Sequence, residues 1–169
     1  MLGNRLYNPR KGEHVLETTR NKWLYVFALA LFAVVSGSHA PAQQLSAKLQ
    51  NAVGHWQTYT DGKAGGKVET YLQNGQLFGR ITQVRPGRTP QDLCDLCSGE
   101  YKNQRILGLV LMRGFQPVGD DWVGGTVVDP DNGKQYQGKI WTVGANELHL
   151  RGFIGISLLG RTETWTRIE

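Results

Sequence analysis

Two cysteines three positions apart, Cys94 and Cys97, are the residues of this sequence whose types and spacing most directly indicate chemistry. A Cys-x-x-Cys pair serves redox exchange on a strand-to-helix unit, holds zinc when two further ligands are near, or closes a disulfide in an exported protein. Strand-to-helix patterning is missing here, and His55 and His149 lie on separate predicted strands. We therefore expect a Cys94–Cys97 disulfide, with no metal and no cofactor.

Acidic residues offer weaker signals. Asp129-x-Asp131-x-Gly133 resembles the start of a calcium-binding loop, but the twelfth position is Ile140, where a bidentate Glu is required, so a hairpin turn is the better interpretation. Glu163 is a single carboxylate near a tryptophan, and we expect it on an exposed strand face. Motifs of hydrolases, zinc proteases, phosphate-binding loops and dinucleotide sites do not occur. The sequence therefore predicts a protein without enzymatic activity.

Arg151 is the basic residue that best fits a ligand-binding role. It belongs to the segment ELHLRGF, in which Leu148 and Leu150 share one strand face while His149 and Arg151 share the other. An outward, solvated Arg151 is the interpretation that we favour. If the polar face instead points inward, Arg151 would meet the anionic head group of a ligand.

The elements that would position these residues are short β-strands. Eight segments rich in Val, Ile, Thr and aromatic residues alternate with Gly, Asn, Asp and Pro clusters, which predicts antiparallel neighbours joined by short turns. A short amphipathic helix is expected over Gln43–Ala52, and a long polar loop over Arg85–Arg105 holds both cysteines. The expected strands are Val53–Thr60, Lys67–Gln73, Gln76–Val84, Ile106–Arg113, Asp121–Asp129, Lys134–Val143, Glu147–Phe153 and Arg161–Ile168.

Eight meandering strands form either a sandwich or a closed barrel, and glycines inside successive predicted strands favour the barrel. A barrel of this size has room for its own side chains or for one small ligand. Two functions stay open: a carrier of a small amphipathic molecule, and a filled barrel that serves as an envelope structural or interaction module. For a carrier we expect a cavity lined by Leu77 and Ile81 beside Gly138 and Gly152, with Arg151 near its mouth.

The first 42 residues have the pattern of a secretory signal. An uncharged apolar run of 13 residues, Trp23–Val35, follows five Lys and Arg residues and precedes Ala40-Pro41-Ala42, a small-x-small cleavage site. The run is shorter than the roughly 20 residues of a spanning helix, which argues against a permanent membrane anchor. We expect cleavage before Gln43, one domain over residues 43–169, and a periplasmic or secreted location.

The charge of the expected mature chain excludes one class of partner. It holds 14 Lys and Arg residues against 12 Asp and Glu residues, a net charge of +2. Basic residues are neither clustered nor interleaved with aromatic ones, as a nucleic-acid surface requires. We therefore expect no nucleic-acid partner, and the sequence leaves the oligomeric state open.

Gly54-His55-Trp56 near the start of the β region, with Arg167 near its end, resembles a pattern of the calycin superfamily of lipocalins and fatty-acid-binding proteins. In those proteins the Trp and the Arg stack and plug the closed end of the barrel. The resemblance implies that Trp56 and Arg167 close this barrel, a role that we favour over direct contact with a ligand.

More of the chain resembles the secreted bacterial proteins grouped as domain of unknown function twenty-one forty-seven. This resemblance implies an all-β, eight-stranded antiparallel lipocalin-like barrel with a short N-terminal helix, located in the envelope, and it implies no established activity. The matching pieces include Trp56, Asp61-Gly62-Lys63, Leu77-Phe78-Gly79-Arg80-Ile81, Cys94-x-x-Cys97, Ile106-Leu107-Gly108, Asp121-Trp122, Asp129-Pro130-Asp131-Asn132-Gly133, Arg151-Gly152-Phe153-Ile154-Gly155 and Leu159-Gly160-Arg161.

Overall fold

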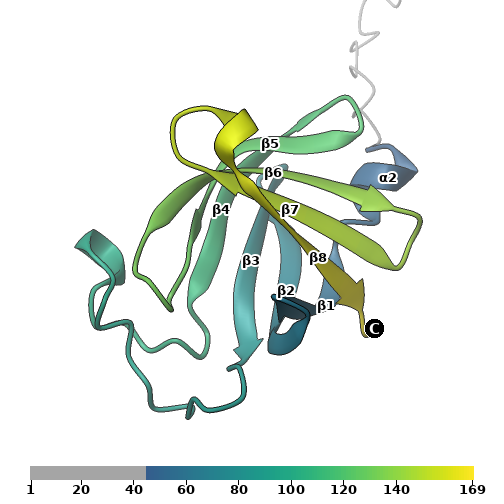
Figure 1. The fold of residues 1–169 in the computed structure, drawn as a ribbon. Coiled ribbons are helices and arrows are strands. Elements are labelled where there is room, and N and C mark those ends of the chain that lie inside the picture. The colour runs from purple at the N-terminus through teal and green to yellow at the C-terminus, as the bar shows by residue number, and fades with distance from the viewer. Residues whose placement is uncertain (1–44) are drawn as a thin grey trace, which may run out of the picture. The chain divides into compact units, whose positions relative to one another are not determined.

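The computed structural model describes residues 45–169, so the predicted signal segment lies outside the described residues. Each strand pairs antiparallel with the next, and the last returns to the first, which closes the barrel (Figure 1). The predicted eight-stranded antiparallel barrel is therefore confirmed. Its elements are α2 (Ala47–Gln50), β1 (Gly54–Thr60), β2 (Lys63–Gln73), β3 (Gln76–Gln83), β4 (Val110–Val118), β5 (Asp121–Val128), β6 (Gln135–Val143), β7 (Glu147–Phe153) and β8 (Arg161–Arg167), with 3-10 turns η1 (Gly99–Tyr101) and η2 (Ser157–Leu159).

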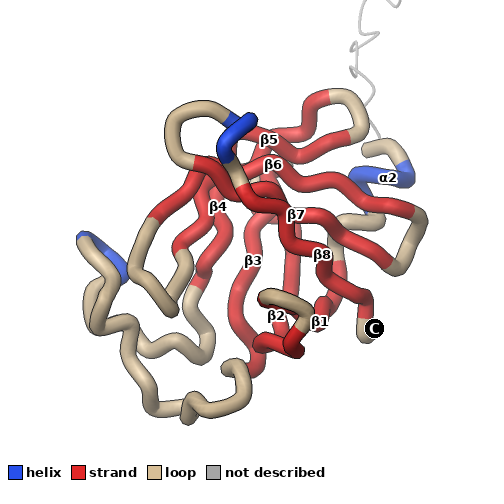
Figure 2. Tube along the Cα trace, viewed as in Figure 1, coloured by secondary structure: helices blue, strands red, loops and turns tan. Residues whose placement is uncertain are grey.

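Antiparallel pairing in sequence order divides the connections between two ends of the barrel. The end that carries the β1–β2, β3–β4, β5–β6 and β7–β8 connections is called the open end here, and the other is called the closed end. The long loop between β3 and β4 extends at the open end (Figure 2). All four of these connections therefore surround the open end of the barrel.

Helix α2 covers the closed end. Ser46 caps it by accepting a hydrogen bond from the Leu49 backbone, and the helix is shorter than the predicted Gln43–Ala52. Its carbonyl groups accept hydrogen bonds from the barrel, Leu49 from the Trp122 indole and Lys48 from the Thr142 hydroxyl. Within residues 45–169, no helix combines the length and the apolar composition needed to cross a bilayer.

Three buried tryptophans fill the barrel between its middle and the closed end. Each indole N–H donates a hydrogen bond: Trp56 to the Thr70 hydroxyl at 2.9 Å, Trp122 to the helix, and Trp165 to the Glu163 carboxylate at 3.3 Å. A buried Trp without such a partner would cost the free energy of desolvating its N–H group. The core is therefore apolar without leaving these polar atoms unsatisfied.

The fourth strand differs from the predicted Ile106–Arg113. It begins at Val110 and continues to Val118, whereas Ile106 and Leu109 are buried at the end of the β3–β4 loop. Gly108 and Leu109 still exchange backbone hydrogen bonds with Ile81 of β3. The strand also contains Pro117, which pairs with β5 beyond the point where the β3 pairing ends. Proline is tolerated there because its missing N–H would face an unpaired edge.

Two strand glycines make room for an aromatic ring. A Cβ atom on Gly138 would lie 2.5 Å from the Phe115 ring, and one on Gly125 would lie 2.2 Å from it. Phe115 is fully buried, so its ring occupies the space that these two side chains would need. Close packing therefore requires glycine at both positions.

The junction of β1 and β8 is short. The residue pairs in register are Trp56 with Arg167 and Gln57 with Thr166, and both lie toward the closed end. Backbone hydrogen bonds between His55 and the last residues of the chain extend the junction in the same direction. Toward the open end, β1 continues through Thr58 and Thr60, which line a cavity instead of pairing with β8.

Candidate functional site

A cavity of about 580 Å³ occupies the open half of the barrel. Its walls are aliphatic, with Val68, Ile81, Leu111 and Leu150 facing inward from four strands, and the indole of Trp165 lies between the cavity and the filled half. Apolar walls with a few charged groups are typical of small-molecule sites. The barrel is thus half filled and half hollow.

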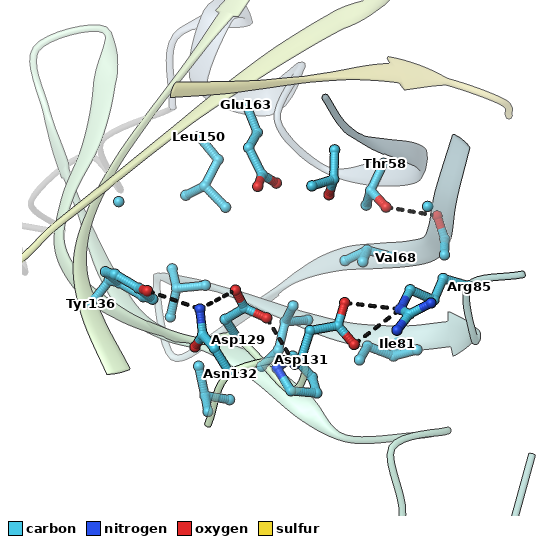
Figure 3. A pocket seen from close by; sticks show the side chains of 18 of the residues that line it. Thr58, Val68, Ile81, Arg85, Asp129, Asp131, Asn132, Tyr136, Leu150 and Glu163 are labelled. Atoms are coloured by element: carbon cyan, nitrogen blue, oxygen red, sulfur yellow. Dashed lines mark hydrogen bonds and ion pairs between the residues drawn. The ribbon is translucent and has the colours of Figure 1, made fainter. Parts of the chain in front are cut away.

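Charged side chains gather at the mouth of this cavity. Arg85 Nε donates hydrogen bonds to both carboxylate oxygens of Asp131, the nearer at 2.9 Å (Figure 3). Arg88 Nη2 donates to the same carboxylate at 2.8 Å. Burial alone would raise the pKa of Asp131, but the hydrogen bonds from Arg88 and Arg85 outweigh it, and the pKa lies below its usual range. Asp131 is therefore ionised at neutral pH and links the β3–β4 loop to the β5–β6 turn.

The Asp129–Gly133 segment forms the hairpin turn between β5 and β6. The Asp129 carboxylate accepts hydrogen bonds from the Asp131 backbone and the Asn132 amide, and that amide also donates to the Tyr136 hydroxyl at the cavity wall. These bonds are the side-chain contacts of a tight turn. Over residues 45–169, no group of three or more His, Cys, Asp or Glu side chains is placed to hold a metal ion.

Glu163 lies inside the barrel, so the predicted exposed position is wrong. It shares the inward face of β8 with Arg161 and Trp165, and its carboxylate points into the cavity between Leu150 and Thr58 (Figure 3). Arg161 donates a hydrogen bond to it at 2.6 Å. This carboxylate is therefore ion-paired with Arg161, and it also accepts a hydrogen bond from the Trp165 indole.

Arg151 does not lie at the cavity mouth. Its neighbours Leu148 and Leu150 point inward, so strand alternation turns Arg151 outward, as the favoured interpretation has it. Its guanidinium donates hydrogen bonds to the carbonyls of Ser157 and Leu158 at 2.8 and 3.1 Å. The alternative, in which Arg151 meets a ligand head group, is wrong because the side chain braces the β7–β8 loop.

Of the other four candidate cavity residues, two line the cavity and two do not. Ile81 and Gly152 line the cavity, whereas Leu77 is fully buried in the filled half. Gly138 faces the Phe115 ring and not the cavity. The predicted cavity walls were therefore placed too near the closed end, because strand alternation identifies the inward residues but not the level at which aromatic side chains stop filling the barrel.

Cys94 and Cys97 form a disulfide within the β3–β4 loop. The Cys94 backbone donates a hydrogen bond to the Gln104 carbonyl and accepts one from Asn103, so the two halves of the loop are paired. The disulfide segment lies against the β5–β6 turn, where a Cβ atom on Gly133 would collide with the Leu96 carbonyl at 2.0 Å. The loop is therefore fixed beside the cavity mouth by backbone contacts as well as by the disulfide.

At the closed end, the guanidinium of Arg167 lies 4.3 Å from the centroid of the Trp56 ring. The same group donates hydrogen bonds to the backbone carbonyls of Val53, Asn51 and Ala145. Burial lowers the pKa of Arg167, but a guanidinium stays charged at neutral pH. Gly54 has a φ of +148°, and a Cβ atom there would lie 2.0 Å from the guanidinium, which explains the glycine before this tryptophan.

Residues 54–167 match the family described as "Uncharacterized protein conserved in bacteria (DUF2147)". The chain belongs to this family. A solved structure with a similar fold is protein HP1028 from the human pathogen Helicobacter pylori, which is described as belonging to the lipocalin family. It shares 21% sequence identity with a TM-score of 0.62, over 69% of this chain and 82% of that one, so the likeness concerns the fold. A comparison with curated proteins finds no match.

The cavity residues of this DUF2147 protein that sequence reasoning missed include Arg85, Arg88, Asp131, Tyr136 and Glu163. The sequence contains a pattern that could have identified one of them. Glu163 lies two positions before Trp165, and residues at this spacing share one face of a strand. The mouth cluster had no such pattern, because Arg85 and Arg88 come from a loop and meet Asp131 across 46 and 43 positions of sequence.

Proposed function

We propose that this protein binds one small amphipathic molecule in the open half of its barrel and performs no catalysis. The observation that carries the proposal is the cavity itself, which has aliphatic walls and a charged mouth. Its volume of about 580 Å³ lies within the range of about 300–1,000 Å³ that is typical of small-molecule sites. A barrel that served only as a filled structural module would need no such space.

The ligand's apolar part would lie against Val68, Ile81 and Leu150, with its polar end among the charged residues of the mouth. The cavity is lined by four basic residues, Lys67, Arg85, Arg88 and Arg161, and by three acidic ones, Asp129, Asp131 and Glu163. This excess of positive charge favours an anionic end over a cationic one. Arg85 and Arg88 thereby take the role that the sequence suggested for Arg151.

The proposed location is the periplasm or the extracellular space after removal of residues 1–42. Two features support it: the signal-like pattern around Trp23–Val35 and the disulfide, since disulfides persist in oxidising compartments. The intact mass of the exported protein tests the location. A species that retains residues 1–42 would contradict it.

The first test is extraction of the native purified protein with organic solvent, followed by mass spectrometry. The second is titration with a fluorescent fatty-acid analogue. Leucine in place of Gly152 should project into the cavity, because a Cβ atom there has only ordinary contact with Tyr136 at 3.5 Å. We expect Gly152→Leu to weaken probe binding by about tenfold or more, since it occupies part of the apolar space.

Gln137→Leu is the matched control, because it adds the same side chain to an exposed position on β6, next to Gly138. It should bind the probe like the parent protein, and circular dichroism should show both variants folded. The proposed function would be contradicted if the parent protein showed no saturable probe binding and the organic-solvent extract contained no bound molecule. Equal binding by parent and Gly152→Leu would place the ligand elsewhere.

A further inference from the structure

Four large aliphatic side chains are exposed together in the β7–β8 loop, which projects from the open end with η2 (Figure 1). Ile154 is 62% exposed, Ile156 59%, Leu158 83% and Leu159 79%. Single exposed aliphatic residues are ordinary on protein surfaces, whereas a contiguous group of them marks an interaction site. The sequence pattern did not single out this loop, because it has neither strand nor helix periodicity.

The loop is held in this arrangement by the barrel. Arg151 donates hydrogen bonds to the backbone carbonyls of Ser157 and Leu158 and to the Thr162 hydroxyl. Gly160 packs so closely on β7 that a Cβ atom there would lie 2.5 Å from the Gly152 carbonyl. Because these contacts with β7 fix the loop backbone, the aliphatic side chains of the loop are exposed to solvent.

The surroundings of the loop indicate what it contacts. Ile154 and Leu159 also line the cavity, so the exposed aliphatic surface continues into the cavity wall. Residues 151–161 include Arg151 and Arg161 at their two ends and no Asp or Glu. The Arg161 side chain is well exposed, although it also pairs with Glu163. Aliphatic side chains bracketed by arginines suit a bilayer with anionic head groups, where the apolar groups enter the acyl region and the cations meet phosphate.

We propose that the β7–β8 loop docks the protein on an anionic lipid bilayer, with Ile156 and Leu158 inserted and the cavity mouth turned toward the lipid. This inference goes beyond ligand binding, since it assigns a surface and a partner. An amphipathic ligand could then move from the bilayer into the cavity along Ile154 and Leu159 without crossing water.

The test is flotation with vesicles of equimolar phosphatidylcholine and phosphatidylglycerol. Residues 43–169 are used, because they carry the complete closed barrel and its core. The double variant Ile156→Ser/Leu158→Ser removes two exposed loop side chains that do not line the cavity. We expect its partition coefficient to fall by about tenfold or more, since insertion depends on buried apolar area. Vesicles of phosphatidylcholine alone should bind the parent more weakly.

Val118→Ser/Val143→Ser is the matched control. These valines are 59% and 56% exposed, and both lie next to turns of the closed end. This variant should float like the parent. A parent that does not bind vesicles, or equal binding by the loop variant, would overturn the proposal. Sedimentation showing that the parent self-associates through this loop would assign the surface to a second copy of the chain and would overturn it as well.

The two proposals fail separately. Without vesicles, Ile156→Ser/Leu158→Ser should bind the fluorescent fatty-acid analogue as the parent does, because its cavity wall is unchanged. Loss of flotation with retained probe binding supports the docking surface. A parent that floats with vesicles but never binds the probe would refute ligand binding in the cavity and leave the docking surface standing.

Discussion

Arg167 Nη1 lies 3.0 Å from the carbonyl oxygen of Val53, while the same guanidinium stacks on the ring of Trp56. One side chain from the last strand therefore fixes both the first strand and the segment that leads from α2 into it. Arg167→Ala would lose the contact with the ring and leave three backbone carbonyls without this donor. We expect the free energy of unfolding to fall by about 1–3 kcal/mol, measured by chemical denaturation.

Probe binding by Arg167→Ala should match the parent, because the cavity lies in the other half of the barrel. Arg167→Lys keeps the charge but not the planar group that reaches three carbonyls, so its stability should lie between those of the parent and the alanine variant. Unchanged stability in the alanine variant would refute the structural role of this residue.

Paired glycines on β6 and β7 should respond differently to the same change. Gly138 and Gly152 are partners across the two strands, yet a Cβ atom on Gly138 would lie 2.5 Å from the Phe115 ring, whereas one on Gly152 would lie 3.5 Å from Tyr136. Gly138→Ala should lower the free energy of unfolding by about 1–3 kcal/mol because the core becomes overpacked. Gly152→Ala should be neutral or stabilise by up to about 1 kcal/mol, since its Cβ atom has ordinary contacts and the unfolded chain loses freedom.

The double variant Gly138→Ala/Phe115→Leu tests the cause. A shorter side chain at residue 115 makes room for the new methyl group, so adding Gly138→Ala to Phe115→Leu should cost less than adding it to the parent protein. Additive losses in a denaturant series would show that Gly138 is required for a reason other than the ring.

The Asp131 carboxylate gives the mouth a pH dependence. Its pKa is lowered in the folded state, so its ion pairs with Arg88 and Arg85 stabilise the protein above the usual carboxyl pKa of about 4. This stabilisation is lost as the pH falls through the lowered value. Asp131→Asn should therefore be less stable than the parent at neutral pH, and the difference should shrink toward pH 3 in chemical denaturation.

A double-mutant cycle of Asp131→Asn with Arg88→Gln isolates the ion pair. The coupling between the two changes should be present at neutral pH and approach zero in acid, because protonation removes the charge that Arg88 contacts. A coupling that does not change with pH would mean that the link between loop and turn does not depend on this charge.

The disulfide should contribute modestly. Cys94 and Cys97 close a small ring, for which loop-closure entropy gives about 2 kcal/mol. We expect Cys94→Ser/Cys97→Ser to remain a folded barrel, because the loop is also paired through its backbone and packed on the β5–β6 turn. Circular dichroism and thermal unfolding, with and without a reducing agent, measure this. Unfolding of the parent by reduction alone would contradict it.

Alternation of side chains explains both what the sequence predicts well and what it misses. The inward face of β7 follows from Leu148 and Leu150, and the same rule places Arg151 outside. Glu163 obeys it too, since it shares the inward face of β8 with Trp165, but a lone carboxylate on a strand is expected in solvent. The predicted start of the fourth strand was too early because Ile106 and Leu109 have strand-like residue types but are buried at the end of the β3–β4 loop.

The alternation of side chains does not predict which residues form the cavity mouth. Arg85, Arg88 and Asp131 carry no local pattern, and they meet because the long loop folds onto the β5–β6 turn, a contact between distant segments. The level at which the barrel stops being filled also depends on distant packing. It is set by where the rings of Phe115 and Trp165 end, which no single strand reveals.

The short β1–β8 junction gives the barrel wall unequal stiffness around its circumference. Trp56 and Gln57 pair with β8 and close the barrel there. From Thr58 to the end of β1, no residue pairs in register with β8. Widening the mouth along this line would therefore break fewer hydrogen bonds than widening it anywhere between two fully paired strands. For the ligand binding proposed above, this means that a molecule somewhat wider than the cavity would enter by displacement of β1 near Thr58 and Thr60, while the half of the barrel filled by tryptophans keeps its shape.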